Sequence, residues 1–112
     1  MALVSEQAAF LQDLARLIVY AAEQGWTVTA GELFRTPEQQ AIYVKTGRSK
    51  TSNSYHLKRL AGDPNFFKGG ALVYDVTALR PLGAYWEGLN PKNSWGGNWN
   101  SFKDVPHFER RA

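Results

Sequence analysis

The chain contains no cysteine, and this absence limits its fold more than any other feature of the sequence. Without cysteine there are no disulfides, no thiolate metal ligands and no cysteine nucleophile. The 112 residues must therefore fold without covalent cross-links, and that length supports one domain. The hydrophobic content of 44% is typical of a globular protein. We expect a single α+β domain over residues 1–112.

The net charge of +3 favours anionic surroundings, such as nucleic acid or an anionic cell wall, without identifying either. No segment approaches the roughly 20 apolar residues that cross a bilayer, so no membrane insertion is expected. Residues 1–7 lack a basic region, and Asp13 and Arg16 interrupt the apolar stretch that follows. These features predict that the chain carries no signal peptide.

Hydrophobic periodicity and capping signals predict two helices in the first half of the chain. The first spans about residues 5–24, and Gly25 is placed to end it. The second begins at Thr36 as the N-cap, with Pro37 in the first turn, and stops near Gly47. The apolar positions of the first helix recur at helical spacing: Phe10, Leu14, Leu17, Ile18 and Ala21.

The remaining signals alternate between strands, turns and one short helix. Residues 68–70 predict a hairpin, and Pro64 predicts that the strand before it is an edge strand or is broken. Together these signals indicate a small, mainly antiparallel sheet packed by two to three helices. We expect strands at 26–29, 60–67, 71–76 and 107–109, a helix at 78–88 capped by Thr77 with Pro81 near its first turn, and loops at 45–54 and 90–100.

The two histidines, His56 and His107, both lie near carboxylates. Two imidazoles and one carboxylate form a common protein ligand set for catalytic zinc, which lowers the pKa of water to about 7. On this interpretation His56, Asp63 and His107 are the ligands, and Asp104 is the general base. Residues three apart in a straight strand face opposite sides, so Asp104 and His107 require a bend near Pro106.

The same residues also allow a purely structural interpretation. The histidines can be surface or hydrogen-bonded side chains, and Asp63 beside Pro64 suits a turn. Asp104 can cap a turn, and Glu109 can pair with a neighbouring arginine. Asp75 is a rival to Asp63 as the carboxylate ligand of a metal. Residues alone leave these alternatives open.

Four motifs in order resemble the zinc D-Ala-D-Ala carboxypeptidase superfamily, the VanY-like peptidases. The first is Ser54-x-His56 followed by Asp63, and another is Asp104-x-x-His107. Residues 31–40 resemble the upstream arginine segment, and residues 95–109 are similar to phage endolysins that act as L-alanyl-D-glutamate peptidases. The resemblance extends from about Phe10 to Glu109.

This resemblance implies a Hedgehog/DD-peptidase-like fold and a zinc peptidase that cuts the peptide stem of bacterial peptidoglycan. It implies Zn²⁺ bound by His56, Asp63 and His107, with Asp104 as the acid/base residue. Arg35 is expected to face the scissile carbonyl or a substrate carboxylate, or else to pair with Glu32 or Glu38. Ser54 is expected to contact substrate or support the metal site, or else to make a turn hydrogen bond.

The expected bond is L-Ala–D-Glu, and the expected setting is phage lysis. The protein would be made in the host cytoplasm as a monomer and reach the wall after a separate holin-type protein permeabilises the membrane. D-Ala-D-Ala carboxypeptidase activity and a catalytically silent cell-wall-binding module with a structural metal are the alternatives. No nucleic acid partner and no separate cell-wall-binding domain are expected.

Three details bear on these expectations. A nucleic-acid site would have to use the basic residues Arg48, Lys50, Lys58 and Arg59, which lack a recognition helix or stacking motif behind them. Pro64 and Asn65 stand where relatives usually continue with an apolar strand residue. Trp95 and Trp99 either line the substrate groove or pack the core.

Overall fold

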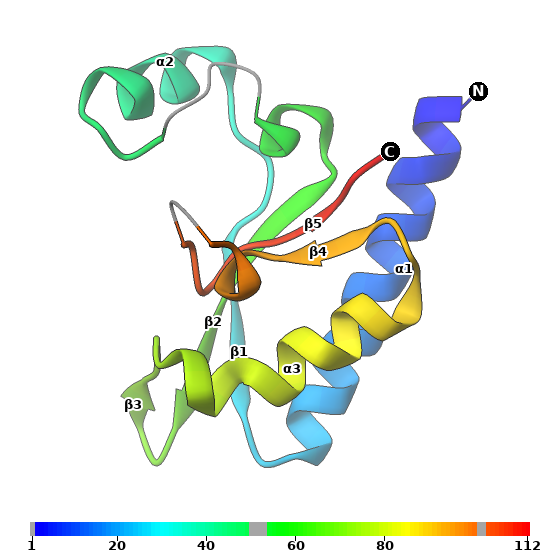
Figure 1. The fold of residues 1–112 in the computed structure, drawn as a ribbon, viewed down its shortest axis with the longest axis vertical. Helices are drawn as coiled ribbons and strands as arrows, with labels where there is room; N and C mark the ends of the chain where they lie inside the picture. Colours follow the sequence, from blue (N-terminus) through cyan, green and yellow to red (C-terminus); the bar gives the residue numbers. More distant parts are fainter. Residues whose placement is uncertain (1, 50–53, 101–102) are drawn as a thin grey trace.

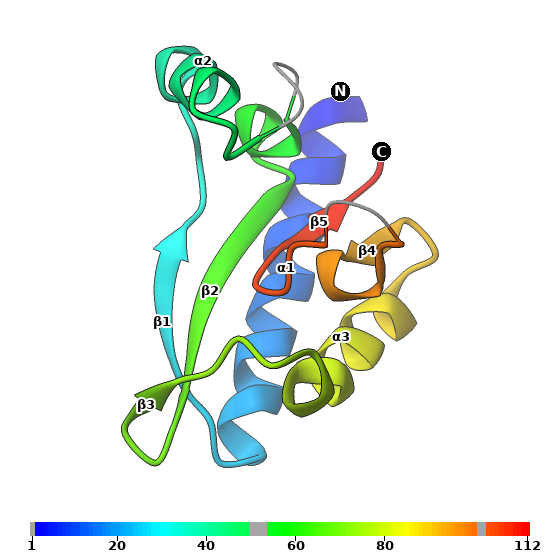
Figure 2. The ribbon, with the colours of Figure 1, turned by 60° about the vertical axis from the view of Figure 1, so that its left-hand side comes forward.

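The computed structural model describes residues 2–49, 54–100 and 103–112 as an α+β domain. Residues 50–53 of the predicted basic loop, with Lys50, therefore lie outside the described residues. Helices α1 and α3 lie side by side along the sheet (Figures 1 and 2). Helix α2 lies apart from both of them, at the top of the two views. The elements are α1 (Ala2–Glu23), β1 (Thr27–Glu32), α2 (Pro37–Lys45), the 3₁₀ helix η1 (Tyr55–Lys58), β2 (Ala61–Lys68), β3 (Ala71–Leu72), α3 (Val76–Leu89), β4 (Asn93–Trp95), the 3₁₀ helix η2 (Gly96–Asn98) and β5 (Phe108–Arg110).

All strand pairs in the sheet are antiparallel, and the main order is β1-β2-β5-β4 with β3 on β2. The predicted fold class, a mainly antiparallel sheet with two to three helices, is confirmed. Strand β2 is the link between the two halves of the sheet, since it pairs with β1 along most of its length and with β5 at Ala61 and Gly62. Segments far apart in the sequence therefore meet at the start of β2.

Local signals place both early helices correctly. Helix α1 begins at Ala2, earlier than predicted, and ends in a turn where Gly25 has φ +91° and the Trp26 amide donates to the Ala21 carbonyl. Ile18, predicted on the apolar face, is 38% exposed. Thr36 caps α2 by accepting a hydrogen bond from the Gln39 amide, as predicted.

The predicted strand at 71–76 is wrong beyond Leu72. The chain turns into α3 instead, because the Asp75 side chain accepts a hydrogen bond from the Ala78 amide and caps this helix. Asp75 therefore replaces Thr77 as the N-cap. Pro81 lies inside α3 and not in its first turn, at a position where one backbone hydrogen bond is missing.

Strand β4 lies in the segment that was predicted as a loop at 90–100. Its residues pair with β5, with Asn93 opposite Arg110 and Trp95 opposite Phe108. Two glycines follow it and, with Asn98, form η2. The local sequence has no strand pattern here, so the pairing partner, distant in sequence, determines the conformation.

Pro64 does not break β2, and it is not on an edge strand. Thr29 pairs with Asn65 and Glu32 pairs with Asp63, so two residues of β1 lie opposite the single Pro64. This bulge suits a residue without an N–H donor. Gly31 has φ +59° there, and a Cβ at this position would lie 1.9 Å from the Asp63 carbonyl oxygen. The bulge therefore lets β2 continue past Asp63 without interruption.

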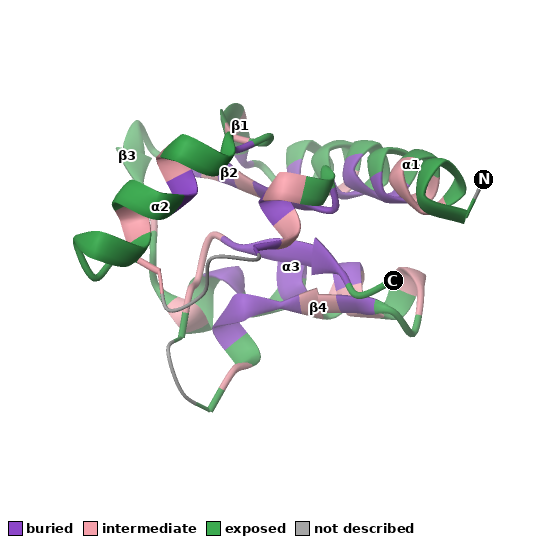
Figure 3. Ribbon diagram, turned by 90° about the horizontal axis from the view of Figure 1, so that it is seen from above, coloured by how far each residue is buried: buried purple, intermediate pink, exposed green. Residues whose placement is uncertain are grey.

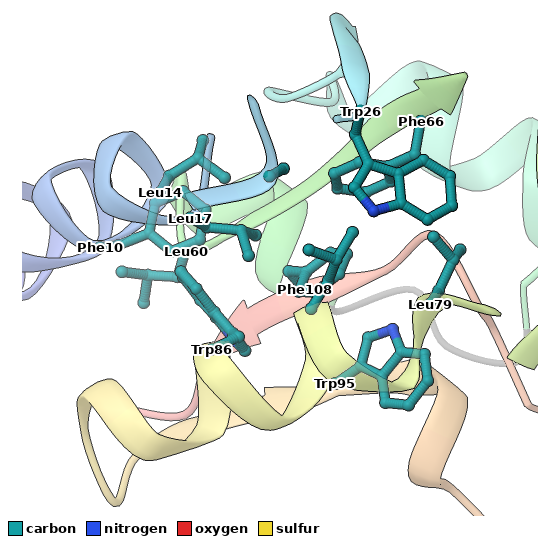
Figure 4. Packing of buried hydrophobic residues seen from close by; sticks show 12 residues of the cluster. Phe10, Leu14, Leu17, Trp26, Leu60, Phe66, Leu79, Trp86, Trp95 and Phe108 are labelled. Carbon is teal, nitrogen blue, oxygen red and sulfur yellow. The ribbon is translucent and has the colours of Figure 1, made fainter. Parts of the chain in front are cut away.

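The core lies between the sheet and helices α1 and α3, with Phe108 at its centre (Figure 4). The Phe108 ring contacts Phe66, Trp86 and Trp95. Trp95 is fully buried, and its indole nitrogen donates to the Val105 carbonyl at 2.7 Å. Trp95 is thus a core residue and not a groove residue. Buried residues gather on β2, β4 and β5 and on the faces of α1 and α3, while much of α1 and α2 is exposed (Figure 3).

Within the described ranges, no helix has both the length and the apolar content that crossing a membrane requires.

Candidate metal centre

The fold brings His56, Asp63 and His107 together from three separate segments. His56 lies in η1, Asp63 lies in β2, and His107 directly precedes β5. Because Gly62 pairs with Phe108, the pairing of β2 with β5 sets Asp63 beside His107. One ligand atom from each of the three side chains lies within 4.8 Å of the others. The three predicted metal ligands therefore form one cluster, in which they could hold a metal ion.

His56 is oriented for coordination through Nε2. Its side chain is buried, and its Nδ1 lies 2.8 Å from the Leu33 carbonyl oxygen. This contact makes Nδ1 the donor, so Nε2 is left with its lone pair. The buried Nε2 has no hydrogen-bond partner among the described residues, and it lies 3.3 Å from Asp63 Oδ1. A buried nitrogen without a partner is costly, and a metal ion at this position would remove that cost.

Ser54 sets the start of η1. Its hydroxyl accepts a hydrogen bond from the His56 amide at 3.1 Å, and its side chain is buried. This is the turn hydrogen bond that was one of the two interpretations of Ser54. The contact fixes the backbone of His56, while a substrate contact by Ser54 stays a prediction.

His107 is held on both sides of its ring. Its Nδ1 lies 3.0 Å from Asp63 Oδ1, and its Nε2 lies 2.7 Å from Glu109 Oε1. The second oxygen of Glu109 accepts from Arg111 Nε at 2.6 Å. A carboxylate on the outer nitrogen of a ligating histidine fixes the ring and raises its basicity. The arrangement therefore suits coordination through Nδ1 of His107.

Sequence reasoning missed the contact of Glu109 with His107, although the pairing of Glu109 with a neighbouring arginine was considered and is found with Arg111. The two-residue spacing of His107 and Glu109 in the sequence was the signal that could have predicted this contact. Residues two apart in an extended segment face the same side, so a carboxylate at 109 can reach the imidazole at 107.

The cluster strongly shifts two pKa values. Burial disfavours ionisation of Asp63, but its hydrogen bond to His107 and its close approach to the His56 imidazole outweigh burial and lower its pKa to about 2. Burial likewise opposes charge on His107, yet the hydrogen bonds to Asp63 and Glu109 raise its pKa to about 9. The carboxylates thus create a strongly negative environment that favours a cation between Asp63 and the two imidazoles.

Asp104 lies beside the cluster on a tight turn. The His107 amide donates to the Asp104 carbonyl at 3.1 Å, which closes a turn through Val105 and Pro106. This is the bend that the sequence required, and it places Asp104 Oδ2 3.9 Å from His107 Nδ1. Gly96 supports the turn, because a Cβ there would lie 2.1 Å from the Asp104 carbonyl oxygen.

The environment of Asp104 suits proton transfer. Burial and the nearby charge of Asp63 raise the pKa of the Asp104 carboxyl above its ordinary value. Its side chain is 38% exposed, so it remains accessible from the solvent side. A carboxyl with a raised pKa beside a cation site can act as a general base and then as a general acid.

Arg35 is buried and held by two neighbours. Its Nε donates to Glu32 Oε1 at 2.7 Å, and its Nη1 donates to Gln40 Oε1 at 2.7 Å. The structural ion pair is therefore present, with Glu32 and not with Glu38. Arg35 Nη2 also lies 3.9 Å from Asp63 Oδ2, so the guanidinium borders the candidate metal centre.

A polar cavity of about 290 Å³ adjoins the cluster. Three acidic residues line it, namely Glu32, Asp63 and Asp104, and two arginines contribute positive charge. Such a cavity can hold part of a polar chain next to the candidate metal centre. Its lining residues are Gly31, Glu32, Arg35, Tyr43, Arg48, Asp63, Asn65, Tyr74, Asp104 and Pro106.

Two further candidate residues, Trp99 and Asp75, make contacts that explain their positions in the fold. The ring of Trp99 lies 5.2 Å from that of His107, centre to centre, and its indole nitrogen donates to Ser94 Oγ at 3.0 Å. Trp99 is half-buried, so it packs against the outer side of the candidate centre. Asp75 caps α3 and is not a member of the cluster.

Comparisons with known proteins agree with this geometry. Residues 47–110 match the peptidase M15 family described as D-alanyl-D-alanine carboxypeptidase. The L-alanyl-D-glutamate peptidase of Listeria phage A118 is 35% identical over 84% of this chain, and the chain spans about a third (34%) of that protein. The peptidoglycan L-alanyl-D-glutamate endopeptidase CwlK of Bacillus subtilis is 30% identical, covering 88% of this chain and 69% of CwlK.

A solved structure supports the same relationship. The crystal structure of the L-Ala D-Glu endopeptidase ChiX from Serratia marcescens matches with a TM-score of 0.71 and 26% identity, over 88% of this chain and 78% of ChiX. The family match covers more than half of the chain, and CwlK is matched over more than two thirds of its own length. The chain therefore belongs to the M15 peptidase family.

Proposed function

We propose that this protein is a zinc peptidase that hydrolyses the L-Ala–D-Glu bond in the peptide stem of bacterial peptidoglycan. The cluster of His56, Asp63 and His107 beside a polar cavity is the observation that carries the proposal. Relatives named as L-alanyl-D-glutamate peptidases support the choice of bond. The buried Nε2 of His56 has no hydrogen-bond partner in the described part of the chain, which supports a resident metal ion.

In this proposal His56 Nε2, Asp63 Oδ1 and His107 Nδ1 hold the ion. Three protein ligands leave a coordination position open, as in catalytic zinc sites. When bound, zinc supplies Lewis acidity, which polarises a carbonyl group and lowers the pKa of water. Leu33 and Glu109 hold the outer ring nitrogens, so that both imidazoles keep the tautomer that coordination needs.

Asp104 moves the proton. During hydrolysis the oxygen of water bonds to the carbonyl carbon, the carbon–nitrogen bond breaks, and a water proton ends on the departing amine. The Asp104 carboxylate accepts that proton and then donates it to the amine nitrogen. Arg35, held by Glu32 and Gln40, supplies positive charge near the oxygen that becomes negative.

Digestion of purified sacculi tests the proposal. The zinc-loaded protein is incubated with sacculi, with and without a chelator, and the new chain ends are identified by mass spectrometry. The proposal predicts new N-terminal D-Glu that depends on the metal. Release of free D-Ala would support the alternative activity in the description of the matched family, a D-Ala-D-Ala carboxypeptidase. Binding to sacculi without any new ends would support a silent wall-binding module.

We further propose that the protein acts as a phage endolysin. The phage relative supports this setting. The protein would accumulate as a monomer in the host cytoplasm and reach the wall after a separate holin-type protein opens the membrane. Expression in a bacterial host with and without a holin tests this: lysis should follow only with the holin, and lysis without it would contradict the proposed route.

A further inference from the structure

We propose that Arg48 binds a free carboxylate of the substrate, namely the carboxylate of the glutamate unit whose amide nitrogen is released. This inference rests on the proposed function, and it names a residue that selects the substrate. It starts from the cavity beside the candidate metal centre, where Arg48 forms part of the wall.

The end of α2 fixes the position of Arg48. After Lys45 the helix closes in a turn in which Gly47 has φ +80° and the Arg48 amide donates to the Tyr43 carbonyl at 2.8 Å. This turn folds the chain back, so the Arg48 guanidinium lies 4.6 Å from the centre of the Tyr43 ring. The ring is itself anchored, because the Tyr43 hydroxyl donates to Glu32 Oε2 at 2.8 Å. Arg48 is thus held at the cavity by a cation–π contact.

The two arginines of the cavity differ in their partners. The Arg35 guanidinium also lies 4.6 Å from the Tyr43 ring centre, but it is bound to Glu32 and Gln40. Arg48 is exposed and, unlike Arg35, takes part in none of the ion pairs found among the described residues. Its planar guanidinium is therefore available to form paired hydrogen bonds with a carboxylate.

The chemistry of the proposed reaction brings a carboxylate to this cavity. Asp104 donates its proton to the departing amine, so the residue that carries this amine must lie in the cavity that Asp104 lines. In an L-Ala–D-Glu substrate that residue is glutamate, which has two carboxyl groups. One continues the peptide, and the other is free or is present as an amide. Asp63 and Asp104 repel a free carboxylate, whereas Arg48 attracts it.

Two synthetic stem peptides test the inference, identical except that the free carboxyl of the glutamate unit is replaced by a carboxamide in one. The values of kcat/KM are measured for the wild type and for Arg48→Gln, Arg48→Lys and Arg80→Gln. Arg80 is an exposed arginine of α3 that does not line the cavity, so its substitution controls for the loss of one positive charge. Dissociation constants for both peptides are measured in an Asp104→Asn background, in which they are not consumed.

The wild type should prefer the free carboxylate by about tenfold, the effect of one charge-assisted hydrogen bond. Arg48→Gln should lose this preference mainly through KM, Arg48→Lys should keep part of it, and Arg80→Gln should keep all of it. An Arg48→Gln variant that loses the same factor on both peptides, or on neither, would overturn the inference. If the wild type cleaves neither peptide, the proposed function fails, and the dissociation constants alone then decide whether Arg48 selects a carboxylate.

Discussion

The imidazole of His107 donates from Nε2 to Glu109 Oε1 across 2.7 Å, although the two residues are only two positions apart in one extended segment. Both residues are buried, and their side chains lie on the same side of the extended chain. This contact turns the other ring nitrogen of His107 toward Asp63. Glu109 therefore orients a proposed metal ligand without touching the metal position itself.

Substitution of Glu109 should weaken metal binding while leaving the three ligands in place. Glu109→Gln removes the charge that supports His107, and we expect the zinc affinity to fall about ten- to a hundredfold. Competition with a chromophoric chelator measures this change. Glu23→Gln, at an exposed position in the last turn of α1, is the matched control and should bind zinc as the wild type does. Equal affinities for both variants would contradict the role of Glu109.

Asp104 and His107 should separate catalysis from metal binding. Asp104→Asn keeps the shape of the turn but cannot carry a proton, so activity on sacculi should fall about 10²- to 10⁴-fold while the zinc content stays unchanged. His107→Ala should lose both zinc and activity. If zinc content falls as far in Asp104→Asn as in His107→Ala, the division of roles is wrong.

Gly96 should be required for the position of the Asp104 turn. Gly96→Ala places a Cβ against the Asp104 carbonyl oxygen and beside His107, so the turn must shift and both metal affinity and activity should fall. Gly88→Ala, within α3, is the control, because no atom lies within 4 Å of the added Cβ. That variant should be active and slightly more stable, by less than about 1 kcal/mol. Wild-type activity in Gly96→Ala would show that the turn tolerates displacement.

Glu6 should contribute to stability in a defined acidic range. Its hydrogen bonds to Arg110 and Lys92 lower the pKa of Glu6 from 4.5 to about 2 in the folded protein. The ionised carboxylate therefore stabilises the fold above pH 4.5, and this contribution disappears as the pH falls toward 2. Urea unfolding at pH 7, 4.5 and 2 measures it: Glu6→Gln should be less stable than the wild type at pH 7 and equal to it at pH 2. Parallel stability profiles for the two proteins would contradict this assignment.

The sequence predicts those features that depend on near neighbours. The cap at Thr36, the turn at Gly25 and the bend before His107 each arise from contacts within a few residues, and each is found. Strand β4 could not be predicted, because only its pairing with β5 makes it a strand. Asp75, considered as a ligand, proved to be a helix cap.

The candidate site likewise combines features that the sequence predicts with contacts that depend on distant parts of the chain. Motif order was enough to bring His56, Asp63 and His107 into one group, and the structure places them together. The partners of these residues depend on distant backbone: Leu33 reaches His56 only because the chain between β1 and α2 passes beside η1. The bulge that lets β2 pass Pro64 also depends on a strand far along the chain. Such contacts require the folded arrangement.

The zinc content of the purified chain tests the central claim most directly. The wild type and Asp63→Asn are each exposed to zinc, dialysed against metal-free buffer and measured by mass spectrometry of the metal. We expect one zinc ion per wild-type chain and a clearly lower content in Asp63→Asn. A wild-type chain that retains no zinc, or an Asp63→Asn variant that retains as much as the wild type, would contradict a metal centre built from His56, Asp63 and His107.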